Sequence, residues 1–229
     1  MNWLASDAAM VRRLVIKDWQ VYRKQLYGYL AGMAVALALV ATGAGPAQAA
    51  GSLLLLVLLL VVGSYAIQTA IMAERKQQTV PFIMSLPVTP MDVYWGKLLA
   101  NLVIYLAPFV LVVGGLVGLV LSKPLLPDGL VPWVAVVAGF MLVVFCVSLC
   151  LAIAVESEGW NVFGMLVLMT LIGPFIWWVG TFEGIRSYMR GDVVVWSGAS
   201  VGMLVAEACV IVVAVLVTSW GHARRRSFL

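Results

Sequence analysis

Few side chains in this sequence have the type and setting to do chemistry, and Glu207 is the foremost of them. It is the one carboxylate predicted well inside a long apolar run, Ser200–Trp220. A charge in such a setting is costly, so residues of this kind usually face a cavity or a partner. Glu207 is therefore predicted to line a translocation pathway or a contact between helices, as the protonated acid. The alternative is that it reaches water, or pairs with Arg186 or Arg190, near the end of the run.

The other candidates for catalysis or metal binding are weaker. Cys146/Cys150 and Met165/Met169 are pairs four residues apart on predicted helices, and thiolate and thioether ligands select copper(I). Cys and Met are also ordinary residues of an apolar interior, and the single histidine, His222, lies in a basic tail. An enzyme site needs paired acid and base groups or a metal. We predict no catalytic residue and no metal site.

The composition places these residues in a membrane protein. The chain has 229 residues, of which 64% are hydrophobic and 10% are charged, and its mean hydropathy is +1.08. A soluble domain averages about 25% charged residues. The comparison excludes a soluble globular protein, a disordered chain, a secreted disulfide scaffold and a nucleic-acid binder.

Six continuous apolar runs are each long enough to cross a bilayer as a helix, which takes about 20 residues. The runs are Leu26–Thr42, Ser52–Ala73, Lys97–Leu121, Val131–Val155, Val162–Phe182 and Ser200–Trp220. Strands of a barrel would alternate instead. We predict a single all-α membrane domain over residues 1–229, with six transmembrane helices in residues 26–220 and a cytoplasmic tail at 221–229. Pro108 and Pro174 predict kinks, which are candidate gates.

Glycines mark two further features of the predicted bundle. A Gly/Ala/Pro turn is predicted at Gly43–Ala50, between the first two spans. The pairs Gly28/Gly32 and Gly114/Gly118 have the spacing of small residues that let helices approach closely. They predict close packing, either within the chain or between subunits.

Basic residues predict the orientation, because cytoplasmic loops of membrane proteins are rich in Lys and Arg. Eleven of the fourteen fall on one side: Arg12, Arg13, Lys17, Arg23, Lys24, Arg75, Lys76, Lys97, Arg224, Arg225 and Arg226. The other three, Lys123, Arg186 and Arg190, fall on the opposite side. Both termini are therefore predicted to lie in the cytoplasm.

Residues 8–25 are predicted to form an amphipathic helix in the cytoplasmic interface. Apolar residues recur at helical spacing at Val11, Leu14, Val15, Trp19, Tyr22 and Leu26. The opposite face carries Arg13, Lys17, Gln20 and Lys24. Basic residues opposite Leu and Trp are typical of a helix lying on a membrane. A solvated N-terminal extension is the alternative.

The loop after the second span is the most informative stretch. Thr79 is placed to cap a short helix, with Pro81 in its first turn, and Pro87 ends it. This helix carries Phe82, Ile83, Met84 and Leu86. An exposed apolar patch of this kind indicates a docking site. Alternatively, these side chains dip into the lipid interface.

The stretch Glu74–Leu99 resembles the permease subunit of ABC transporters of the type-2 exporter kind. The resemblance rests on a charged cluster, a short apolar helix, Leu86-Pro87-Val88-Thr89 and Gly96-Lys97-Leu98. In that family the loop is the coupling helix, which docks on the ATP-binding subunit. Contacts with that subunit are implied for Glu74, Thr79, Val80, Phe82, Ile83, Met84, Leu86 and Pro87. The sequence departs from the family pattern at Gln78 and Pro81, where Gly-Thr and an acidic residue are usual.

The resemblance implies a transmembrane subunit of an ATP-driven exporter in a bacterial-type cytoplasmic membrane. The chain lacks a Gly-x4-Gly-Lys-Ser/Thr loop, so two separate ATP-binding subunits are expected to bind ATP and Mg, with no cofactor in this chain. A second six-span permease is expected to complete a homodimer or heterodimer. Membrane lipid is the other expected partner, and nucleic acid is not. Short outer-leaflet helices are implied in residues 183–199. The alternative is a secondary transporter or channel that uses Glu207.

Overall fold

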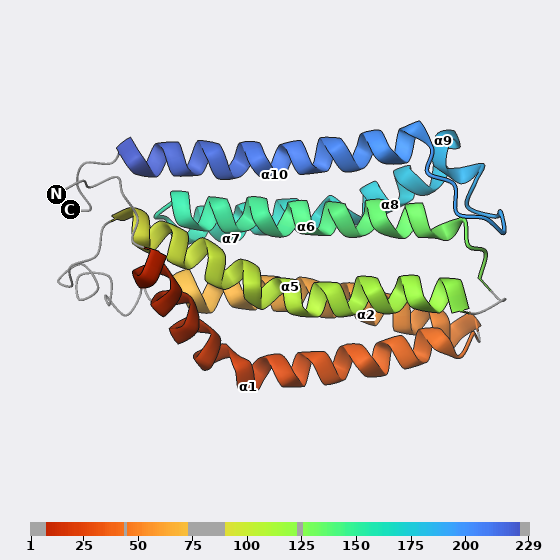
Figure 1. Ribbon diagram of the computed structural model, residues 1–229, viewed down its shortest axis with the longest axis horizontal. Coiled ribbons are helices and arrows are strands. Elements are labelled where there is room, and N and C mark those ends of the chain that lie inside the picture. Colours follow the sequence, from red (N-terminus) through yellow and green to blue (C-terminus); the bar gives the residue numbers. More distant parts are fainter. Residues whose placement is uncertain (1–7, 44, 73–89, 123–125, 225–229) are drawn as a thin grey trace.

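The computed structural model describes residues 8–43, 45–72, 90–122 and 126–224, and within them all regular structure is helical. Six stretches are long and apolar enough to cross a membrane: Val11–Ala41, Gly45–Met72, Met91–Ser122, Leu130–Ala154, Glu158–Thr181 and Gly198–Arg224. The predicted all-α architecture with six spans is confirmed. The long helices run beside one another along one axis, and the start of the first and the end of the last lie at the same end (Figure 1). We call this the termini end, and the opposite one the far end.

The first helix, α1 (Ala8–Ala41), joins the predicted interfacial segment to the first span without a break. The chain offers no proline here to stop it, and its opening turns are set at an angle to the rest (Figure 1). Arg13, Lys17 and Lys24 are exposed, as the predicted polar face requires. The apolar face turns inward, with Tyr22 6% exposed. Residues 8–25 therefore pack on the protein through the face predicted to meet lipid.

The turn between the first two spans is shorter than predicted. It includes Gly43, whose φ of 67° favours glycine, and α2 (Gly45–Ile67) already begins at Gly45. The prediction of a turn through Ala50 is wrong, because Pro46 is tolerated in a first helical turn and the alanines that follow favour helix. At Gly51 a Cβ would lie 2.7 Å from the carbonyl oxygen of Ala36. The two helices thus meet backbone to backbone at this glycine.

The main core lies between α1, α2, α5 (Pro90–Ser122) and α6 (Leu130–Ala154). Tyr105 of α5 stacks on Phe145 of α6 with ring centroids 3.9 Å apart. A Cβ at Gly63 of α2 would lie 3.0 Å from the Phe145 ring, so α2 packs tightly on this pair through a glycine. After α2 the chain continues as a π-helical turn, η1 (Gln68–Met72), at the termini end.

The fifth span is interrupted near Pro174, where the sequence predicts a kink. It consists of α7 (Glu158–Thr170) and α8 (Ile172–Thr181). A proline clashes with the carbonyl group four residues earlier, which here belongs to Thr170. Pro108 lies inside the uninterrupted helix α5, so the two prolines differ in their effect.

One short helix, α9 (Glu183–Arg186), lies in the connection at the far end. The rest of residues 187–197 form turns and extended chain, so one of the expected outer helices is present. The amide of Gly129 donates to the carbonyl oxygen of Gly191 at 2.9 Å and joins this connection to the start of α6. The last helix, α10 (Gly198–Arg224), packs on α6 and runs parallel to it from the far end to the termini end (Figure 1).

Candidate functional site

The predicted coupling residues lie outside the described part of the chain. They are Glu74, Thr79, Val80, Phe82, Ile83, Met84, Leu86 and Pro87. The structure does describe the two helices that flank this stretch, since η1 ends at Met72 and α5 begins at Pro90. A site that transmits motion through residues 73–89 must act on these two ends, and polar contacts from α1 reach both of them.

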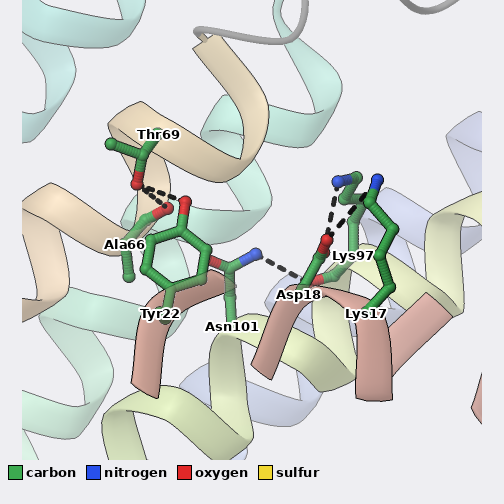
Figure 2. Close-up of polar contacts among 7 residues, drawn as sticks. All are labelled: Lys17, Asp18, Tyr22, Ala66, Thr69, Lys97 and Asn101. Carbon is green, nitrogen blue, oxygen red and sulfur yellow. Dashed lines mark hydrogen bonds and ion pairs between the residues drawn. The ribbon is translucent and has the colours of Figure 1, made fainter. Parts of the chain in front are cut away.

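An ion pair joins α1 to the first turns of α5. The Lys97 ammonium group lies 3.2 Å from a carboxylate oxygen of Asp18. The Lys17 ammonium group lies 3.8 Å from the other oxygen, but its side chain is 53% exposed (Figure 2). Asp18 itself is 5% exposed. A carboxylate withdrawn from water to this degree is stable only while it is paired, so Asp18 holds α1 against α5 through Lys97.

A second polar contact joins the same part of α1 to η1. The hydroxyl of Tyr22 donates to the hydroxyl of Thr69 (Figure 2). The Thr69 hydroxyl in turn donates to the carbonyl oxygen of Tyr65 at 2.5 Å. Tyr22 is one helical turn after Asp18, so both contacts come from one face of α1. The π-helical turn sets the position of Thr69 at the end of the second span.

Close packing supports these polar contacts. A Cβ at Gly96 would lie 2.9 Å from Leu14 Cδ1, so α5 has a glycine where α1 crosses it. Asn101, which is fully buried, donates to the carbonyl oxygen of Lys97 at 2.8 Å and braces the turn that carries the ammonium group (Figure 2). The first turns of α1 are thereby anchored to both helices that flank residues 73–89. We call the contacts Asp18–Lys97 and Tyr22–Thr69 the α1 clamp.

Sequence reasoning did not find this clamp. Leu14, Asp18 and Tyr22 follow one another at intervals of four residues and share a helix face with buried apolar residues. A carboxylate on a buried face is the signal that would have singled out Asp18. Its partner, 79 residues away, is not given by any local pattern.

Glu207 lies in a contact between two spans. It is 8% exposed, and a Cβ at Gly139 of α6 would lie 2.1 Å from one of its carboxyl oxygens. Each residue is nine positions from the start of its helix, or roughly 13 Å from the far end. Among the described residues neither carboxyl oxygen has a hydrogen-bond partner, so the alternative, a pairing with Arg186 or Arg190, is not formed.

The remaining sequence candidates occupy packed positions. Cys146 and Cys150 are buried free thiols, and the Ser64 hydroxyl lies 3.9 Å from the Met169 sulfur. Within the described residues no group of three His, Cys, Asp or Glu side chains comes together as metal ligands would. Chemically, the described part of the chain offers packing and ion pairing rather than a reactive centre.

The predicted glycine pairs fall mostly outside the helix contacts. Gly32 lies near Leu58, where an added Cβ would meet a side-chain carbon at 3.3 Å. Around Gly28, Gly114 and Gly118 no described atom beyond the local helix lies within 4 Å of the position of a Cβ. Close packing within the chain occurs at other glycines, so packing between subunits remains the prediction for these three.

Taken together, the six apolar spans define a multi-pass membrane protein. A family model described as ABC-2 family transporter protein matches residues 13–223. The chain belongs to this family, and so it is the membrane domain of an ABC transporter. No curated protein and no solved structure match it. The family pairs with ATP-binding subunits, in agreement with the resemblance found in residues 74–99.

Proposed function

We propose that this chain is the transmembrane subunit of an ATP-driven exporter. The observation that carries the proposal is the α1 clamp, which ties the helices on both sides of residues 73–89 to one helix. Two separate ATP-binding subunits would dock on the segment from Glu74 to Pro87 and bind ATP and Mg. Their closure would move η1 and α5 together with α1, because buried ion pairs resist separation.

In this proposal the termini end faces the cytoplasm of a bacterial-type membrane. The support is the placement of the basic residues, since Arg12, Arg13, Lys17, Arg23 and Lys24 are exposed at the start of α1. The pathway would form between two six-span subunits, identical or homologous. Pro174, Pro108 and Glu207 are its candidate gate and lining residues.

Substitution in the predicted coupling helix tests the proposal. Phe82→Asp and Ile83→Asp should each weaken binding of the ATP-binding subunit by about tenfold or more, since a carboxylate in an apolar interface is left without a partner. Phe82→Leu is the matched control and should retain binding. Co-purification in mild detergent measures the loss, and the elution profile of the chain alone checks its fold. Full binding and full stimulated ATPase activity in both Asp variants would contradict the proposal.

A secondary transporter or channel that works through Glu207 is the second candidate. It is favoured by the carboxyl group of Glu207, which has no hydrogen-bond partner in the part of the chain that the structure describes. It predicts transport by the chain alone in liposomes, without an ATP-binding subunit, and loss of that transport in Glu207→Gln. The exporter predicts transport only when the ATP-binding subunit and ATP are present.

A further inference from the structure

An open groove lies between the ends of α5 and α10 at the termini end. Its volume is about 530 Å³, and its lining residues are Met91, Leu216, Val217, Ser219, Trp220 and Ala223. Five of these are apolar or aromatic. The α10 side remains uncovered, with Leu216 60%, Val217 62% and Trp220 58% exposed. An apolar surface at the end of a transmembrane helix is in contact with lipid chains or a partner.

Two contacts join α5 to α10 next to the groove. The hydroxyl of Tyr94, a residue 1% exposed, donates to the carbonyl oxygen of Val215 at 3.2 Å. Its ring also lies 5.4 Å from the ring of His222, between centroids. These contacts hold α5 and α10 at a fixed separation beside Met91. A preformed groove of this kind loses little freedom when a ligand enters it.

A cation is held at the mouth of the groove. The Arg224 guanidinium carbon lies 3.7 Å above the Trp220 ring, and the side chain is exposed. Stacking on an aromatic face leaves the edge of a guanidinium group available for a phosphate, which it binds through two parallel hydrogen bonds. The neighbouring carboxylate on α5, Asp92, is 2% exposed, so it does not offer a competing surface charge.

We propose that this groove is a specific site for an anionic phospholipid. An acyl chain would lie along Leu216, Val217 and Met91, and the phosphate would meet Arg224 above Trp220. The charge and the depth agree with this occupant, because tryptophan and arginine at a span end mark the level of the headgroups. This inference is independent of the exporter proposal, since it concerns the chain without its ATP-binding subunits.

Lipid titration of the purified chain, followed by native mass spectrometry, tests the site. Phosphatidylglycerol should bind more tightly than phosphatidylcholine. Arg224→Gln should raise the apparent Kd for phosphatidylglycerol by roughly fivefold, and Trp220→Ala should raise it by a similar factor. Arg224 is exposed in the last turn of α10, so its substitution leaves the fold intact and decides the question even if Trp220→Ala misfolds.

Matched controls separate a built groove from general attraction. Arg190→Gln and Trp177→Ala alter exposed residues of the same types at the far end and should leave the Kd unchanged. Changing Arg225 and Arg226 together to Gln should reduce binding less than Arg224→Gln does. Any one of three results would overturn the inference. The first is equal affinity for the two lipids. The others are an equal loss of affinity in the Arg190→Gln and Trp177→Ala controls, or a loss caused wholly by changing Arg225 and Arg226.

Discussion

Removing Lys97 should destabilise the bundle far more than removing the charge of its partner. The Lys97→Met substitution keeps most of the side-chain volume. It leaves Asp18, with a side chain 7% exposed, to Lys17 as the remaining ion-pair partner among the described residues. The Lys17 ammonium group is 3.8 Å away and its side chain is 53% exposed, so water screens it. Asp18→Asn instead leaves an amide oxygen that accepts from Lys97, whose side chain is 15% exposed and so has access to water.

The magnitudes follow from this asymmetry. Breaking a buried ion pair from one side costs about 3–5 kcal/mol, and partial compensation by Lys17 lowers our expectation for Lys97→Met to about 2–3 kcal/mol. We expect about 1 kcal/mol for Asp18→Asn, the typical value of one hydrogen bond. The double variant should stay within about 1 kcal/mol of Asp18→Asn, because no unpaired charge is left in it.

Thermal unfolding of the four proteins in detergent measures these differences. A loss of 2–3 kcal/mol corresponds to a fall of about 5–10 °C in Tm for a chain of this size. The double-mutant cycle also cancels other contacts that Lys97 makes. The buried ion pair would be refuted if the two single variants lost equal free energy of unfolding. It would also be refuted if the loss in the double variant equalled the sum of the two single losses. In the assembled transporter, Lys97→Met should also lower ATP-driven transport more than ATPase activity.

Further substitutions probe the packing and the clamp. Gly51→Ala should lower the free energy of unfolding by about 2–3 kcal/mol, because its Cβ would meet the Ala36 backbone. Gly114→Ala is the control: no described atom beyond the local helix lies within 4 Å of its Cβ, so it should change stability by less than about 1 kcal/mol. Chemical unfolding of the two variants compares these values. Gly139→Ala should cost about 1–2 kcal/mol through its clash with Glu207. In a Glu207→Ala background the same change should cost less, since the contact at 3.3 Å with Leu204 is then the tight one that is left. An equal cost in both backgrounds would contradict the contact. Tyr22→Phe should lower Tm by about 2–4 °C by removing one hydrogen bond to η1, and a Tm equal to that of the parent chain would count against this contact.

The spans could be predicted from the sequence because their length is set by the bilayer rather than by neighbours. A run of about 20 apolar residues satisfies its backbone only as a helix when it lies in lipid. Pro174 likewise interrupts the fifth span as predicted. The prediction that the connection between the first two spans extends to Ala50 is wrong, because its sequence fits both a loop and the start of a helix.

The clamp could not be predicted in the same way. Asp18 and Lys97 are 79 residues apart, and Tyr22 and Thr69 are 47 apart. Each contact depends on how far two helices are rotated about their own axes. The amphipathic pattern of residues 8–25 orients α1, but α2 and most of α5 are apolar on all sides, so their residue patterns do not fix that rotation.

The sequence by itself determined an all-helical chain with six spans, and its resemblance to ABC-2 permeases agrees with the family match. Hydrophobic length carries the information on the spans within each segment. Only the tertiary structure decided that α1 anchors both helices flanking residues 73–89, and that Glu207 faces Gly139. The physical reason is that these contacts form where close backbone approach, made possible by glycines such as Gly96, brings distant side chains together.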